Sequence, residues 1–214
     1  CLRRDCMCGR FALVSDLRTL EEKFHVQRVQ GAWRPSWNIT PDHPVPAVMH
    51  HDGIRILLGL RWGLTPAFSK DPLARKMINA RAETVDKKPS FRDAFHRRRC
   101  LIVADGFYEW KKERKAKTPF YFYLKSGQPF GFAGLYESRL SPDGQITGAC
   151  AIITTQANEL VAPVHHRMPV ILSNRLEQDL WLGPSPADPQ NLLSLLKPLP
   201  ADEMDFKEGL GPRD

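Results

Sequence analysis

Cys100-Leu101-Ile102-Val103-Ala104 and Phe120-Tyr121-Phe122-Tyr123-Leu124 are the two segments that decide the fold class. The first is an uninterrupted apolar run, which is typical of a buried strand. The second alternates Phe and Leu with Tyr, which indicates a strand with two different faces. Strand patterns recur at 130–135, 149–155 and 169–172, with the turn sequence Pro142-Asp143-Gly144 between two of them. We therefore expect a single α+β domain, mainly antiparallel β-structure flanked by helices.

The first part of the chain predicts one helix and mostly extended structure. Ser15 is a suitable N-cap for a helix whose apolar residues recur as far as Phe24. Four prolines between residues 33 and 47 exclude a helix there and favour an extended, turn-rich segment. A short strand is expected over 54–58, and residues 61–78 have the composition of a loop.

Three further helices are expected. One spans 89–97, and another spans 173–182 and stops at Gly183. The last is capped by Asp188, with Pro189 in the first helical position. We expect the domain to span residues 7–200, with a flexible tail over 201–214 and an N-terminal extension over 1–6 that is absent or removed in the mature protein.

Composition excludes several protein classes. The chain has 214 residues, 42% hydrophobic and 26% charged, as in an ordinary globular domain. Its apolar runs are much shorter than the roughly 18 to 20 residues that cross a bilayer, so no membrane partner is expected. The N-terminal residues lack the apolar region of a secretion signal, and the five cysteines do not suggest a disulfide scaffold. A cytoplasmic, nucleoid-associated monomer is the expectation.

The net charge of +7 is concentrated in one stretch. Residues 87–117 hold eleven Lys or Arg against four Asp or Glu, so this stretch alone carries an excess equal to that of the whole chain. Such a concentration fits a polyanionic partner, most simply nucleic acid. A solvated basic face without a partner explains it equally well.

Several polar residues stand in contexts that composition does not explain: Cys8, Asn38, Asn79 with Arg81 and Glu83, Glu109, and His165 with Arg167. Each also has an ordinary structural interpretation, as a buried thiol, a turn former, a surface ion-pair partner or a packing histidine. Glu109 follows an apolar strand, so burial there would raise its pKa. The cysteine spacing does not match a structural zinc site, and neither a metal nor a cofactor is expected.

Seven segments, taken together and in this order, resemble the SRAP family of SOS-response-associated peptidases, also described as abasic-site processing proteins. The match runs from about Met7 to Leu182, and its segments are Met7–Phe11, Asn38–Pro41, Arg61–Pro66, Asn79–Thr84, Arg99–Trp110, Ala133–Tyr136 and His165–Pro169. The resemblance implies a protein that binds single-stranded DNA, or its junction with duplex, and crosslinks itself covalently to an abasic site. It also implies associated lyase and self-processing activity.

The resemblance assigns site residues by position. The catalytic cysteine, asparagine, glutamate and histidine of the family fall on Cys8, Asn79, Glu109 and His165. The arginines implied to contact the DNA backbone are Arg10, Arg81 and Arg167. Further DNA-binding positions implied by the matching segments and the loop after them are Asn38, Pro41, Trp62 and Phe68, of which the last stands where a tryptophan is common in the family.

The implied chemistry suits an N-terminal cysteine. An amine adds to the aldehyde of an open abasic sugar to give a Schiff base, and the thiol then closes a five-membered thiazolidine. His165 and Glu109 are suitable proton-transfer groups, and the division of their roles stays open. While residues precede Cys8 its nitrogen is an amide, so this chemistry requires their absence or removal.

Two other functions stay open from the sequence. Cys8 and His165 are also the nucleophile and base expected of a cysteine peptidase that acts on other proteins. A non-catalytic reader of modified DNA would use the basic stretch and the aromatic residues alone. His166 stands where the family often has aspartate or asparagine, a difference that leaves the assignment of His165 unchanged.

Overall fold

The computed structural model describes residues 8–31, 33–65, 76–113, 116–140, 146–183 and 188–213. Its elements, in chain order, are β1 (Phe11–Leu13), α1 (Leu17–Phe24), β2 (Arg28–Gln30), β3 (Ser36–Ile39), β4 (Pro44–His51), β5 (Ile54–Trp62), β6 (Asn79–Arg81), η1 (Ala82–Thr84), α2 (Pro89–Arg97), β7 (Arg99–Ala104), β8 (Gly106–Lys112), β9 (Lys117–Leu124), β10 (Phe130–Leu140), β11 (Ile146–Gln156), β12 (Arg167–Pro169), β13 (Ile171–Leu172), α3 (Arg175–Leu182), α4 (Pro189–Ser194), η2 (Ala201–Glu203) and β14 (Met204–Glu208).

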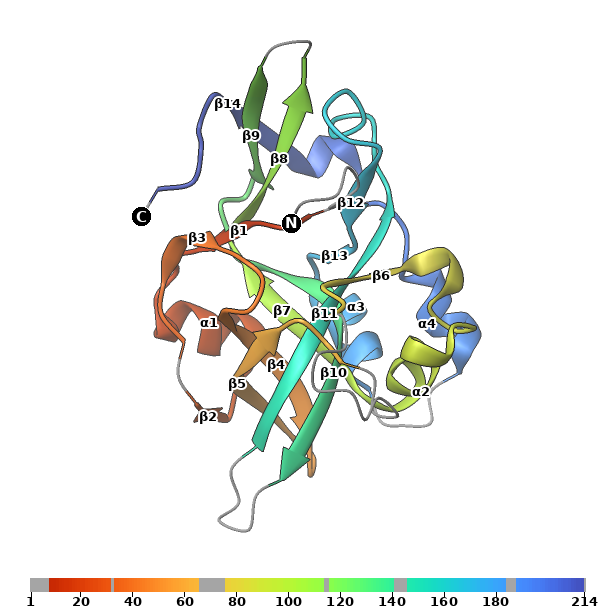
Figure 1. The fold of residues 1–214 in the computed structure, drawn as a ribbon. Helices are drawn as coiled ribbons and strands as arrows, with labels where there is room; N and C mark the ends of the chain where they lie inside the picture. Colours follow the sequence, from red (N-terminus) through yellow and green to blue (C-terminus); the bar gives the residue numbers. More distant parts are fainter. Residues whose placement is uncertain are drawn as a thin grey trace.

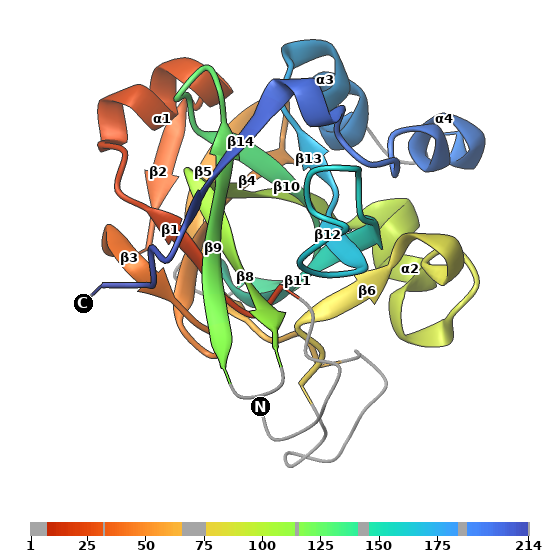
Figure 2. The same cartoon turned by 90° about the horizontal axis from the view of Figure 1, so that it is seen from above.

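The centre of the molecule is a closed ring of five strands. β11, β10, β7, β4 and β5 pair antiparallel in that order, and β5 returns to pair parallel with β11 at Trp62 and Cys150. Figure 2 looks down on this ring from above. β7 is buried along its whole length, as its uninterrupted apolar sequence predicts, because it lies between β10 and β4.

A second sheet, ordered β14-β9-β8-β1-β3, extends upward from the ring (Figure 1). Its inner face joins the main core through Phe11, Phe107 and Phe122, all fully buried. Its outer face carries a separate small cluster around Ala12, Tyr108 and Tyr121. The alternation of Phe and Tyr in β9 therefore reflects two different apolar clusters, one on each side of the sheet.

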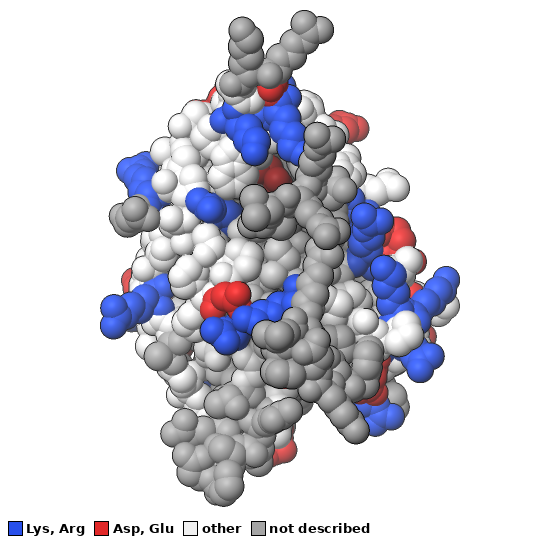
Figure 3. All heavy atoms as spheres, viewed as in Figure 1, with Lys and Arg blue, Asp and Glu red and all other residues white. Residues whose placement is uncertain are grey.

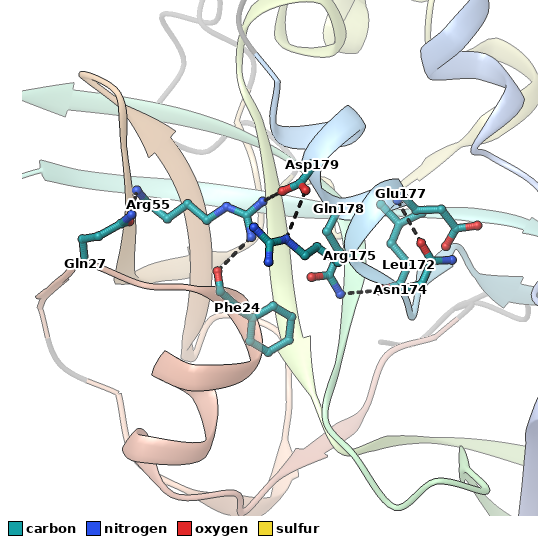
Figure 4. A network of polar contacts seen from close by, with 9 residues as sticks. All are labelled: Phe24, Gln27, Arg55, Leu172, Asn174, Arg175, Glu177, Gln178 and Asp179. Atoms are coloured by element: carbon teal, nitrogen blue, oxygen red, sulfur yellow. Dashed lines mark hydrogen bonds and ion pairs between the residues drawn. The ribbon is translucent and has the colours of Figure 1, made fainter.

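The helices lie outside the strands. α3 and α2 pack on β7 and α1 contributes Leu20 and Phe24 to the core. Arg55 of β5 links two of these helices, because its buried guanidinium donates to the Phe24 carbonyl at the end of α1 and pairs with Asp179 of α3 (Figure 4). No helix within the described residues is long and apolar enough to cross a membrane.

The structure confirms the expected α+β architecture and most of the expected elements. The helix expected over 89–97 and the one capped by Asp188 form as predicted, and Asp188 accepts a hydrogen bond from the Gln190 nitrogen at 2.9 Å. The strands expected from residue 100 onward are all present. The turn expected at 142–144 lies outside the described residues.

Three expectations were wrong. The cap of α1 is Asp16, whose carboxylate accepts from the Thr19 nitrogen at 2.8 Å, whereas Ser15 instead bonds to Asp105. Residues 204–208 are not a flexible tail, because β14 pairs along its length with β9. β4 and β8 were missed as strands, β4 because two of its eight residues are proline and proline is uncommon within sheets.

Candidate functional site

Cys8 and Glu109 are in direct contact, although 101 positions separate them in the chain. The backbone nitrogen of Cys8 donates to Oε1 of Glu109 at 2.7 Å. Cys8 is 1% exposed and Glu109 is 4% exposed, so the contact is buried. The pairing of β1 with β8 brings them together. Phe11 of β1 lies opposite Phe107 of β8, and Cys8, three residues before Phe11, therefore lies beside the middle of β8.

Burial changes the acid–base properties of both groups. Loss of solvation raises the pKa of Glu109 to about 7, although its hydrogen bond from Cys8 opposes the shift. The same burial, together with the nearby Glu109 carboxylate, raises the pKa of the Cys8 thiol. At neutral pH the carboxyl is therefore divided between its two protonation states, which suits proton transfer, and the thiol is neutral.

Asn79 begins β6, which runs parallel to β11. Its Nδ2 is buried and has no hydrogen-bond partner among the described residues. A buried amide donor without a partner is costly, so its position suggests that a ligand oxygen completes it. Asn79 is thus available to bind an oxygen without any change of charge.

His165 lies at the end of the segment before β12 and is half-buried. Its Nδ1 lies 3.1 Å from both the nitrogen and the carbonyl oxygen of Arg167, so the Arg167 backbone orients the ring in either tautomer. Burial lowers the pKa of His165, helped by the charges of His166, Lys112 and Arg167. Lys112 also acts on Glu109, so this lysine lies within electrostatic range of both proton-transfer candidates.

Arg167 is held by partners inside the protein, and its contact with a DNA backbone stays a prediction. Its guanidinium pairs with Glu83, with one contact at 3.0 Å, and donates to the Thr154 carbonyl at 2.6 Å. The pairing with Arg167 lowers the pKa of Glu83. Arg167 is 8% exposed and ties η1, β11 and β12 together behind His165.

Arg81 and Arg10 are the arginines more open to a DNA backbone. Arg81 is exposed and lines a polar hollow of about 460 Å³ together with Gln156, His166 and the edge of Arg167. Arg10 is partly buried, and its guanidinium lies over the ring of Trp110 at 5.5 Å. A phosphate in the hollow would meet positive charge and hydrogen-bond donors.

Trp62 cannot stack on an exposed base, and this expectation was wrong. Its side chain is 0% exposed, packs against Phe11 with ring centroids 5.2 Å apart, and donates through its indole nitrogen to the Ile78 carbonyl at 2.9 Å. Its role is therefore in the core. Phe68, the other aromatic residue expected at the DNA, lies outside the described residues.

Asn38 and Pro41 lie at the end of β3 and in the turn that follows it. Both are partly buried, and Asn38 lines a pocket of about 300 Å³ with Trp33, Arg34 and His43. Their position beside β1 places them on the same sheet as Cys8 and Glu109. The structure therefore groups them with the candidate site without showing a contact to it.

The basic stretch does not form one surface. Arg99 is buried and donates to four backbone carbonyls, and Arg98 pairs with Asp93 and Glu137. Figure 3, which colours the described Lys and Arg, shows basic side chains at the top of the molecule, along both sides and near the centre of this face. Part of the charge excess in residues 87–117 thus stabilises the fold.

The sequence did not reveal Thr154 as a partner of Arg167, and the one available signal was the polar pair Thr154-Thr155 at the end of an otherwise apolar strand. No group of three or more His, Cys, Asp or Glu side chains in the described part of the chain is arranged to hold a metal ion.

The backbone of Cys8 is strained. Its φ is 36°, a conformation that residues other than glycine rarely adopt.

Sequence comparison agrees with this arrangement. A family model described as SOS response associated peptidase (SRAP) matches residues 7–208. The abasic site processing protein YoqW of Bacillus subtilis (strain 168) is 46% identical over 204 residues, covering 93% of this chain and 90% of that protein. The abasic site processing protein HMCES of Gallus gallus is 27% identical over 201 residues, covering 79% of this chain and 60% of its own length.

Solved structures share the fold. A crystal structure of a protein from Bacteroides thetaiotaomicron matches with a TM-score of 0.79 and 26% identity, covering 94% of this chain and 91% of that chain. A phage-related protein from Bordetella bronchiseptica matches with a TM-score of 0.72 and 29% identity, covering 94% of this chain and 93% of that chain.

Proposed function

This chain belongs to the SRAP family, and on that premise we propose that it processes abasic sites in single-stranded DNA by trapping the damaged sugar on Cys8. Related proteins are named for abasic-site processing. The observation that carries the proposal is the 2.7 Å contact between the Cys8 nitrogen and the Glu109 carboxylate. This contact supports the proposal because a group that can transfer a proton lies next to the nitrogen that is proposed as the first nucleophile.

The proposed reaction has two bond-forming steps. The α-amine of a chain that begins at Cys8 adds to the C1′ aldehyde of the open sugar, and the resulting carbinolamine loses water to give an imine. The thiol of the same residue then adds across the carbon–nitrogen double bond, with sulfur bonded to carbon and the proton transferred to nitrogen. The product is a five-membered thiazolidine, which an amine alone cannot form.

Glu109 is the proposed base for the first step. A free α-ammonium group on Cys8 would lower the pKa of this buried carboxyl and so favour the carboxylate, the form that acts as a base. The carboxylate can therefore accept a proton from the ammonium group at neutral pH and return it to the departing hydroxyl. The hydrogen bond that the Cys8 nitrogen donates to the Glu109 carboxylate supports this role.

His165 and Asn79 are the proposed partners at the sugar. A neutral His165, which its lowered pKa favours, can accept the proton of the C1′ hydroxyl as the sugar opens, while water supplies a proton to the ring oxygen. The unpartnered Nδ2 of Asn79 can hold a sugar hydroxyl or phosphate oxygen. Arg81 and His166 would position the flanking phosphate in the hollow that they line.

The proposal requires a free nitrogen on Cys8, so any residue before it must be removed, and we include self-cleavage in the proposed activity. The strained φ of Cys8 and the Glu109 carboxylate beside its nitrogen support cleavage at this position. Lyase activity follows from the same imine, because it acidifies the C2′ proton; loss of that proton forms a C2′–C3′ double bond and expels the 3′-phosphate. A cysteine peptidase acting on other proteins is less well supported, since the Cys8 thiol is buried and burial raises its pKa.

A crosslinking assay tests the proposal. Protein that begins at Cys8 is mixed with a single-stranded oligonucleotide containing one abasic site and separated on a denaturing gel. We expect a stable adduct with the wild type and none with Cys8→Ala. Cys150→Ala is the matched control, because it removes another buried thiol. An equally stable adduct with Cys8→Ala, or no adduct with the wild type, would disprove the proposal.

A further inference from the structure

The outer face of the second sheet carries a continuous group of aromatic rings. Neighbouring residues of a strand point to opposite faces, so Glu109 points to the site whereas Tyr108 and Trp110 point outward. We call the outward group the aromatic face; its rings are Trp37 of β3, Tyr108 and Trp110 of β8, and Tyr121 and Tyr123 of β9.

The rings contact one another in a row. The Tyr108 ring lies 4.9 Å from that of Tyr121, and the Tyr121 ring lies 5.8 Å from that of Tyr123 in a stacked arrangement. Trp37 meets Tyr121 edge-on at 5.9 Å. Trp37, Trp110 and Tyr123 are only partly buried, so the outer part of the row is open to a ligand.

Three cations lie over this aromatic face. Arg10 lies over Trp110 at 5.5 Å, Lys207 lies over Tyr123 at 5.5 Å, and Arg213 lies over Trp37 at 5.7 Å. The cations come from the two ends of the described chain and from β14. Aromatic rings interleaved with Lys and Arg are the combination that binds single-stranded nucleic acids, since bases stack on the rings and phosphates pair with the cations.

The hydroxyl of Tyr108 gives a second, independent indication. Tyr108 is 0% exposed, and its Oη is buried without a hydrogen-bond partner among the described residues. Burial raises the pKa of Tyr108, and the positive charges of Arg213 and Arg10 oppose the rise, so both guanidinium groups lie within electrostatic range of this hydroxyl. A donor without a partner between two cations is suited to an anionic oxygen.

We propose that the aromatic face is a binding surface for a nucleotide of single-stranded DNA next to the lesion, with its phosphate between Arg10 and Arg213 and hydrogen-bonded to Tyr108. The proposal rests on the proposed function, because it takes the same DNA strand as the ligand. Continuity supports it: Arg10 is two residues from Cys8, and Glu109 lies between Tyr108 and Trp110 in β8. Arg213, which lies over Trp37, is exposed and can turn toward a bound phosphate.

Tyr108→Phe tests the hydroxyl. The probe is an undamaged, fluorescently labelled single-stranded oligonucleotide, and its affinity for the full chain is measured by anisotropy. We expect affinity to fall about three- to tenfold while the urea midpoint is unchanged or higher, because the hydroxyl has no partner to lose in the free protein. Tyr136→Phe, the same change on β10 away from this face, should leave affinity unchanged.

Arg213→Ala tests the phosphate contact, and Arg18→Ala on α1 is its control. We expect Arg213→Ala to weaken binding and to reduce its salt dependence by about one counterion, whereas Arg18→Ala should have little effect. Wild-type affinity in both Tyr108→Phe and Arg213→Ala would overturn the proposal. An equal loss for single-stranded and duplex probes would also overturn it, because base stacking would then play no part.

The outcome is separable from that of the proposed function. The binding assay uses DNA without an abasic site and does not depend on Cys8 chemistry. Failure of the Cys8 adduct with normal binding would reject only the reaction, and normal crosslinking with unaltered binding by both variants would reject only the aromatic face.

Discussion

Glu109 holds the backbone nitrogen of Cys8 at 2.7 Å inside the protein, and this one hydrogen bond joins the start of the described chain to the middle of β8. A carboxyl group at this depth is unusual unless it is paired with a positive charge. The structure gives it a backbone donor and the more distant charge of Lys112. Burial of the ionised Glu109 carboxyl therefore destabilises the folded protein, and this effect can be measured.

Glu109→Gln should stabilise the protein at alkaline pH. Because the folded pKa of about 7 exceeds the ordinary 4.5, the folded state binds the extra proton, so the wild type loses stability as pH rises from about 4.5 to 7. The shift corresponds to about 3 kcal/mol. Gln retains the acceptor without the charge, so urea unfolding should show little of this loss. Glu159→Gln, an exposed control, should behave like the wild type.

The rate of crosslinking should depend on protonation at the same site. With Glu109 as base, the wild-type rate should rise with pH as the Cys8 α-ammonium group loses its proton, and level off above about pH 8. Glu109→Gln should react at least about tenfold more slowly, with a changed pH profile, because the ammonium group has lost the neighbouring carboxylate. Single-turnover rates measured from pH 5.5 to 9 check this, and an unchanged profile in the variant would exclude Glu109 as the base.

Substitution of Arg167 and of Arg81 should have different effects on stability and on DNA binding. Arg167→Ala removes a buried guanidinium from Glu83 and Thr154 and should lower the free energy of unfolding by about 2 to 4 kcal/mol. Arg81→Ala, at an exposed position, should change it by less than about 0.5 kcal/mol and weaken DNA binding. Equal stability of the two variants would contradict the assignment of Arg167 as an internal anchor.

Trp62 should matter for stability and not for stacking. Trp62→Ala leaves a cavity beside Phe11 and should cost about 3 to 5 kcal/mol. Trp62→Phe keeps most of the packing and should bind single-stranded DNA with wild-type affinity. A selective loss of DNA affinity in Trp62→Phe, with stability unchanged, would contradict this and show that Trp62 contributes to DNA binding.

Strands with uninterrupted or alternating apolar patterns could be predicted because burial alone determines them. β7 and β9 are examples. β14 could not, since four of its five residues are polar or exposed and only its pairing with β9 orders it. The N-cap of α1 was missed by one residue because Ser15 and Asp16 are both good caps, and the more distant Asp105 binds Ser15.

The candidate site could be predicted only through resemblance. The contact between Cys8 and Glu109 depends on the pairing of β1 with β8, which no local pattern encodes. The count of basic residues misled for the same reason. Arg99 adds to the charge of the basic stretch, yet the fold uses it to bind internal carbonyls.

The most direct test of the central claim is intact-mass and peptide mass analysis of protein beginning at Cys8 after reaction with abasic single-stranded DNA. The account predicts one adduct whose mass is that of protein plus DNA less one water, located on the N-terminal peptide and absent from Cys8→Ala. An adduct on any other residue, or one that forms equally well when residues still precede Cys8, would contradict it.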